Sequence, residues 1–205
     1  MKLAFCSGKN KSLFKSIIIF CFVIALVGCE TGKSPSPVKS EVQPFVDSTP
    51  LDKSYQEIIV FELESSTTLK KDYAERILEC RDVLIRSLIN KKKYRKVVPG
   101  HDSSPCEEKQ CLLVKIKLDD MWIAAFWTRR GAGNPSPSYM YMQMKLVDAA
   151  TQKIVREEDF RGENSGWGAI YSFGLTDRNL PSDMGKIMAE YIATVVPNTK
   201  PFKSE

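Results

Sequence analysis

Histidine is nearly absent from this chain of 205 residues, since His101 is the only one. It lies in a polar segment, so a Ser–His–Asp catalytic arrangement would depend on a single loop residue. The sequence also lacks the G-x-S-x-G motif of a nucleophile elbow and the phosphate-binding P-loop motif. The spacing from His101 to Cys106 and Cys111 matches none of the compact zinc patterns. We therefore expect a protein that is not an enzyme and that needs no metal and no cofactor.

An excess of either charge is also missing once the N-terminal segment is set aside. The chain has 30 basic and 25 acidic residues, but residues 1–28 hold four lysines and no acid, which leaves a net charge of +1. The densest remaining basic run covers residues 91–96, where cations suit the negative end of a helix dipole. We expect this run to be a solvated helix end rather than a patch for phosphate or lipid headgroups. We expect no nucleic-acid partner, because such a partner requires a clustered basic surface.

No apolar run is long enough to span a membrane. The run Ile17–Val27 has 11 residues, whereas a spanning helix needs about 20. Lysines without any acid precede it, which is typical of a secretory signal. The segment closes with Leu26-Val27-Gly28-Cys29, which resembles the lipobox of bacterial lipoproteins. The resemblance implies that residues 1–28 are a signal peptide and that Cys29 becomes a lipidated N-terminus.

A lipid on Cys29 would anchor the chain to a membrane and place it in the cell envelope. Glu30 follows the anchor where inner-membrane retention would favour aspartate, so we expect the outer membrane, facing the periplasm, in a cell with two membranes. Residues 29–54 are rich in Ser and Pro and lack an apolar period, which predicts a disordered tether. We expect one domain over residues 55–197 and a C-terminal tail over residues 198–205.

The apolar periodicity of residues 55–197 predicts an α+β fold. Residues 58–61 are typical of a strand. Ser66 or Thr67 is a candidate N-cap of a helix that reaches about residue 91. The charged side chains of this helix, Arg81 among them, are expected to be exposed. Alternating strands are expected from residue 112 onward, from 139 to 146 and from 153, and a last helix from Pro181 to Val195. The order β-α-β-β-β-α predicts two layers, with two helices on one face of a mostly antiparallel sheet.

Three cysteines remain beyond the leader and the anchor. Cys80 is expected to be a small buried core residue of the first helix. Cys106 and Cys111 flank four polar residues just before a strand, which favours a local disulfide in an oxidising compartment. A bridge from Cys80 to one of them is the alternative.

Two aromatic segments indicate a binding surface. Trp, Tyr and Arg are the residue types that anchor interfaces, and they occur together in a hairpin and in a glycine-rich stretch. The candidates are Trp127, Arg129, Arg130 and Tyr139 in the hairpin, and Trp167 and Tyr171 in the glycine-rich stretch. The structural alternative is that these aromatic side chains complete the core beneath loops. The first functional hypothesis is an envelope domain that binds another envelope component, and the second is a small-ligand or glycan binder.

The run of residues 146–155, LVDAATQKIV, resembles a hairpin signature of uncharacterised bacterial lipoproteins with a "domain of unknown function". In that signature a strand is followed by Asp, two variable residues, Thr and Gly. Here Asp148 and Thr151 match, and Gln152 stands at the position of the glycine. The layout is also similar to the N-terminal domain of TolB and to the lipoprotein activator of penicillin-binding proteins. The resemblance implies binding within envelope assemblies and assigns no catalytic residues.

Overall fold

The computed structural model describes residues 41–42, 47–101, 110–124, 137–164 and 175–197. These residues belong to one compact unit that extends from residue 39 to residue 205. In chain order its elements are β1 (Glu41–Val42), β2 (Glu57–Val60), β3 (Glu64–Ser65), α2 (Thr67–Asn90), β4 (Lys96–Pro99), β5 (Cys111–Trp122), β6 (Tyr139–Asp148), β7 (Ile154–Glu163) and α5 (Leu175–Val195).

The strands form one mixed sheet in the order β1-β7-β6-β5-β2-β4, with β3 paired to β5. The α+β class is confirmed. The prediction of a mostly antiparallel sheet holds for the pairs among β5, β6, β7 and β1. It is wrong for the other strands. β2 pairs in parallel with both β4 and β5, and β3 pairs in parallel with β5. Parallel pairing requires a long crossover, and α2 supplies it between β2 and β4. The predicted order also lacked β1, β3 and β4, which are only two to four residues long.

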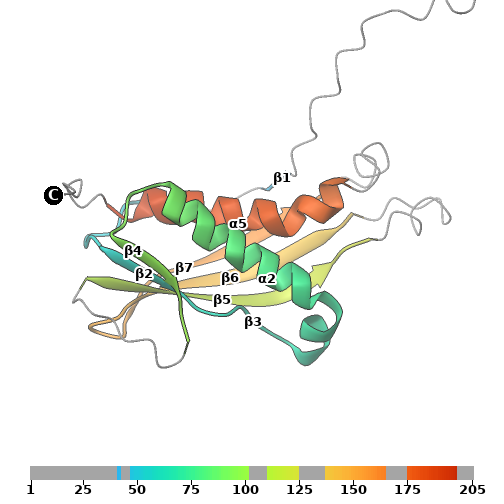
Figure 1. The fold of residues 1–205 in the computed structure, drawn as a ribbon, viewed down its shortest axis with the longest axis horizontal. Coiled ribbons are helices and arrows are strands. Elements are labelled where there is room, and N and C mark those ends of the chain that lie inside the picture. Colours follow the sequence, from blue (N-terminus) through green and yellow to red (C-terminus); the bar gives the residue numbers. More distant parts are fainter. Residues whose placement is uncertain (1–40, 43–46, 102–109, 125–136, 165–174, 198–205) are drawn as a thin grey trace, which may run out of the picture. The chain divides into compact units, whose positions relative to one another are not determined.

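Both helices lie side by side on one face of the sheet (Figure 1). The inward side chains of β5 and β6 pack against them, including three methionines on alternate positions of β6, Met140, Met142 and Met144. The predicted alternation of this strand is therefore confirmed. The opposite side chains of β6 are on the face of the sheet that is turned away from the helices.

Helix α2 begins as the sequence predicts. The Ser66 side chain accepts a hydrogen bond from the Leu69 backbone N–H at 3.3 Å, which satisfies one of the free amides of the first turn. The expected exposure of Arg81 is wrong, because its side chain is buried. Its guanidinium donates to the carbonyls of Val60 at 3.2 Å and Gly100 at 3.1 Å. Arg81 thus ties α2 to the ends of β2 and β4, which a helical charge pattern does not reveal.

Helix α5 begins at Leu175, six residues before the predicted start at Pro181. A proline suits a first turn, and within a helix it removes one hydrogen bond and crowds the preceding turn at a cost of about 3 kcal/mol, so packing has to offset this cost here. Leu180 and Met184 pack into the core around this position. Gly162 of β7 makes room for them, because a Cβ there would lie 2.5 Å from the Met184 sulfur and 3.0 Å from Leu180. The part of α5 that precedes Pro181 can therefore pack closely against β7.

The expectation of a solvated helix end holds for only part of the basic run after α2, because Lys91, Lys92 and Arg95 are exposed whereas Lys93 and Tyr94 are half-buried. Lys93 donates to the carbonyls of Ala193 and, at 2.8 Å, Val196, at the C-terminal end of α5. Tyr94 donates to the Ile192 carbonyl at 3.3 Å. The cation therefore does sit at a helix C-terminus, but the helix is α5 and not the one that precedes it in sequence.

Part of the segment expected as a tether belongs to the folded unit. β1 pairs with β7, and Leu51 is buried while its N–H donates to the Val195 carbonyl at 2.7 Å. Arg156 of β7 donates to the carbonyls of Asp47 and Thr49. Packed structure therefore begins ahead of residue 55.

The cysteines differ in state. Cys80 is a free thiol with no exposed surface, as expected of a core residue, and burial raises the pKa of this thiol to about 12. Cys111 is disulfide-bonded. Cys106 lies outside the described residues, so its pairing with Cys111 stays a prediction.

Candidate functional site

The face of the sheet opposite the helices carries an ordered array of polar and aromatic side chains. They come from β5, β6 and β7, and cross-strand register aligns them in four rows. The rows are Lys115–Lys145–Glu157, Lys117–Gln143–Asp159, Asp120–Tyr141–Arg161 and Trp122–Tyr139–Glu163. We call these twelve side chains the open face, because neither described helix covers them (Figure 1).

A bulge in β5 creates the aromatic half of the open face. The register of β5 against β6 shifts between Leu118 and Asp120. Before the shift the even-numbered residues of β5 are buried, and after it Met121 is buried instead. Because side chains alternate along a strand, one extra residue moves every later side chain to the other face. The bulge therefore brings Asp120 and Trp122 onto the open face.

Three aromatic rings stand in contact there. The Trp122 and Tyr139 ring centroids are 6.5 Å apart, and the Tyr139 and Tyr141 rings stack at 5.0 Å with planes 19° apart. The Arg161 guanidinium lies over the Tyr141 ring, 5.8 Å from its centroid. All three aromatic side chains are only partly buried. The cluster thus combines partly exposed Trp, Tyr and Arg in one fixed arrangement.

Hydrogen bonds to neighbouring carboxylates fix the orientation of both tyrosine side chains. Tyr139 donates to Asp120 at 3.1 Å, and Tyr141 donates to Glu163 at 2.5 Å. Burial and the bond to Asp120 raise the pKa of Tyr139, and the bond to Glu163 together with burial raises the pKa of Tyr141. Both phenols therefore stay protonated and act as donors around neutral pH.

Ion pairs surround the cluster along the strands. Lys117 pairs with Asp119 at 2.5 Å, and Lys145 pairs with Glu157 at 3.1 Å. The hydrogen bond and charge of Asp119 raise the pKa of Lys117. These pairs are exposed to solvent, so each adds little to folding stability.

Of the six residues predicted to bind a partner, the structure describes Tyr139 and places it on the open face. Trp127, Arg129, Arg130, Trp167 and Tyr171 lie outside the described residues, as does the expected lipidation site Cys29.

The described residues that flank the segments with those five candidates lie at the same end of β5, β6 and β7. Ala124 donates to the Ser138 hydroxyl at 2.9 Å, and Asn164 donates to the Ser138 carbonyl at 2.9 Å. The three described ends are therefore neighbours of the row Trp122–Tyr139–Glu163.

Sequence reasoning missed Trp122, Tyr141 and Arg161. Tyr141 shares its side of β6 with Tyr139, so strand alternation alone could have identified it. Arg161 could have been found only from the register of β7 against β6. Trp122 required knowledge of the bulge, which has no local sequence signal beyond the adjacent pair Asp119–Asp120.

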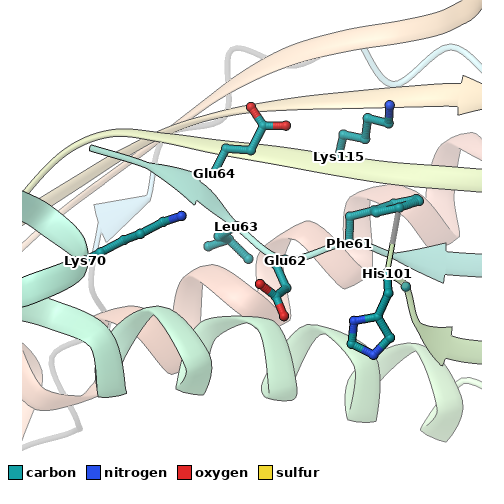
Figure 2. A pocket seen from close by; sticks show the side chains of 8 residues that line it. Phe61, Glu62, Leu63, Glu64, Lys70, His101 and Lys115 are labelled. Atoms are coloured by element: carbon teal, nitrogen blue, oxygen red, sulfur yellow. The ribbon is translucent and has the colours of Figure 1, made fainter. Parts of the chain in front are cut away.

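A cleft of about 300 Å³ lies beside the segment that joins β2 to β3 (Figure 2). Its charged and aromatic lining comes from Phe61, Glu62, Glu64, Lys70, His101 and Lys115. Lys70 extends from the start of α2, and Lys115 comes from β5 (Figure 2). The volume is at the lower end for a small-molecule site.

The described lining of the cleft does not bring a hydroxyl or thiol nucleophile to His101. Among the described residues that line it, none is a serine, threonine or cysteine. The part of the chain that the structure describes also holds no group of three His, Cys, Asp or Glu side chains placed to bind a metal ion. No helix within the described ranges is long and apolar enough to cross a membrane.

A scan against protein-family models gives no match, and a search of curated proteins gives none either. Among solved structures, the chain is similar to a PelC dodecamer subunit from Paraburkholderia phytofirmans, with 10% identity, 78% of this chain and 99% of that chain covered, and a TM-score of 0.47. It is also similar to protein XCC0632 from Xanthomonas campestris, assigned to DUF330, with 10% identity, coverage of 72% and 93%, and a TM-score of 0.41.

A predicted lipoprotein from Caulobacter crescentus gives 12% identity, coverage of 63% and 90%, and a TM-score of 0.23. At such identities and TM-scores, these likenesses carry no argument about ligand, partner or activity.

Proposed function

We propose that this chain is a lipid-anchored, non-enzymatic domain of the cell envelope that binds another envelope component through the open face. The observation that carries the proposal is the partly exposed cluster of Trp122, Tyr139, Tyr141 and Arg161 on the uncovered side of the sheet. Such residues dominate binding energy where a rigid scaffold presents them. The resemblance of residues 26–29 to a lipobox supports the envelope location.

The ring arrangement favours a protein partner over a glycan. A sugar ring would stack on an exposed aromatic face, but Tyr139 and Tyr141 cover each other and Arg161 lies over Tyr141. Their outer atoms are instead hydroxyls bonded to carboxylates. Polar edges with fixed donors and acceptors suit the mixed chemistry of a protein surface.

A small-ligand function is the second candidate, and the cleft beside Phe61 favours it. Opposite charges from Glu62, Glu64, Lys70 and Lys115 line this cleft, so a small zwitterion is the ligand class that suits it. The cleft does not include the aromatic cluster, so the two candidates can be tested separately.

Site-specific photocrosslinking in intact cells tests the proposal. A photoreactive amino acid placed at Tyr139 or Tyr141 should give a discrete covalent adduct, because these positions would contact the partner. The matched controls are Asp82 and Leu78 on α2, whose side chains are exposed on the helical side.

Adducts at the two tyrosines and none at the two controls would support the proposal. Equal adduct formation at all four positions, or none at the tyrosines, would contradict it. The variant Glu62→Gln with Lys70→Met should leave the adducts unchanged, since it alters only the cleft.

A further inference from the structure

The charges of the open face follow a pattern across its three strands, although Lys117 and Glu157 also have ion-pair partners within the chain. In three of the four rows the outer side chains, on β5 and β7, have opposite signs. These outer pairs are Lys115 with Glu157, Lys117 with Asp159, and Asp120 with Arg161. The sign reverses in the third row on both strands at once, so the pattern is not a simple separation of a basic strand from an acidic one.

The members of each pair are too far apart to neutralise each other directly. β6 lies between β5 and β7, and neighbouring strands are about 4.8 Å apart. The paired backbones are therefore separated by about twice that distance. The six charges are all on exposed side chains.

A twofold axis parallel to β6 would match every one of these pairs. Rotation by 180° about this axis places β5 of one copy over β7 of the other, with each row opposite itself. Lys115 then faces Glu157, Lys117 faces Asp159 and Asp120 faces Arg161 of the other copy. Two sheets in face-to-face contact do keep their strands within about 30° of each other, and a twofold interface is self-complementary by necessity.

We propose that the open face is a homodimer interface, in which two copies of this chain pack sheet to sheet about a twofold axis along β6. This inference rests on the proposed function and names the envelope component as a second copy. Tyr139, Tyr141 and Gln143 lie on the axis and meet their own counterparts. Lys145 also meets its own counterpart, which is a like-charge contact, and each Glu157 would then lie between Lys145 of its own chain, at 3.1 Å, and Lys115 of the other copy.

Other placements of a second copy fit the charges less well. A twofold axis perpendicular to the strands would place Lys117 against Asp120 and Asp159 against Arg161, but it would also place Glu157 against Glu163 and leave Lys115 opposite Trp122. Like charges placed opposite each other are strongly unfavourable at an interface. The open face has twelve side chains, whereas a standard interface has about 20–30 residues on each partner. We therefore expect a weak association that depends on both copies being held at the same membrane.

Charge reversal in the full-length chain tests the symmetry. Lys117→Glu alone would face Asp159 twice in the dimer, and Asp159→Lys alone would face Lys117 twice. Each single variant should lower the dimer fraction by about tenfold or more, because like-charge contacts cost several kcal/mol. The double variant should return the dimer to within about twofold of the original level, because the swapped charges are again complementary.

The readout is a thiol crosslink across the axis. Because packed sheets lie about 10 Å apart, which is too far for a disulfide, a short bis-maleimide should join two copies of Gln143→Cys in intact membranes, whereas it should not join two copies of Asp82→Cys on α2. Thermal unfolding of each variant distinguishes lost association from lost folding.

Failure of this inference is separable from failure of the proposed function. Photocrosslinked adducts at Tyr139 that contain a different protein, with no bis-maleimide-linked dimer of the Gln143→Cys variant, would overturn the homodimer and leave the open face as a binding site. Single charge variants that dimerise normally, or a double variant that stays monomeric while folded, would also overturn it.

Discussion

Asp148 is the residue on which the β6–β7 turn depends. Its buried carboxylate accepts from Tyr55 at 3.1 Å, from the Thr151 N–H at 2.9 Å and from Lys53. The hydrogen bond from Lys53 is the main cause that lowers the pKa of Asp148 from 3.8 to about 2, against the effect of burial. The carboxylate therefore stabilises the fold in its ionised form.

Asp148→Asn should destabilise the protein by about 2 kcal/mol at pH 7, because one pKa unit corresponds to about 1.4 kcal/mol. The contribution is fully present above about pH 4 and is lost as the pH falls toward 2, since the folded pKa lies below the unfolded one. Chemical denaturation at several pH values measures it. A deficit that stays constant from pH 7 to pH 2 would contradict this role.

Lys93 shows how one side chain joins two helices. Replacing it with methionine keeps the apolar stem but removes the donor to the Ala193 and Val196 carbonyls. We expect a loss of about 1–2 kcal/mol, from two charge-assisted bonds and the helix dipole. Lys92→Met is the matched control, because the Lys92 side chain is exposed. Equal unfolding midpoints for the two variants would refute the capping role.

At the scale of elements, length decided most of what the sequence could predict, although β2, with four residues, was found from its β-branched and aromatic side chains. Strands β5, β6 and β7 and helix α2 have ten or more residues, enough for their apolar period to define them. β1, β3 and β4 are too short to show a period, and only tertiary pairing reveals them. Gln152 has a φ of 55°, so the position where the resemblance expects glycine does adopt the left-handed conformation.

The contact between the two helices depends on Gly185. A Cβ there would lie 2.5 Å from the Cys80 carbonyl and 3.0 Å from the Leu84 nitrogen of α2. Gly185→Ala would gain about 1 kcal/mol of helix propensity, but backbone atoms cannot move aside as a side chain can. We expect a net loss of about 1–2 kcal/mol from overpacking.

Thermal unfolding checks this prediction, with Lys186→Ala at the exposed neighbouring position as the control. A stabilised Gly185→Ala variant would show that the helices are not in close contact.

At the scale of the whole molecule, the sequence predicted the layers but not the surface. The helices were correctly placed on one face, so the other face had to be exposed. Which side chains share that face depends on the β5 bulge and on the register of three strands, and both are long-range properties. Tyr139 was predicted because it lies in an aromatic segment, whereas Trp122 and Arg161 become visible only once the strands are aligned.

The envelope location makes its own prediction. Cys29→Ser should leave an unacylated precursor, because the thiol is the atom that would carry the lipid. Metabolic labelling with radioactive palmitate followed by isolation of the chain measures this. Labelling that survives the substitution would exclude Cys29 as the anchor.

The most direct test of the open face as a binding surface is thiol labelling of Gln143→Cys in native envelopes. The labelling rate is compared with that of the same variant after purification and high dilution, with Asp82→Cys as the reference for access. We expect the thiol introduced at position 143 to react several-fold more slowly in the envelope, and the thiol introduced at position 82 to react equally in both preparations. Equal rates at position 143 in the two preparations would show that nothing covers the open face and would contradict its role in binding.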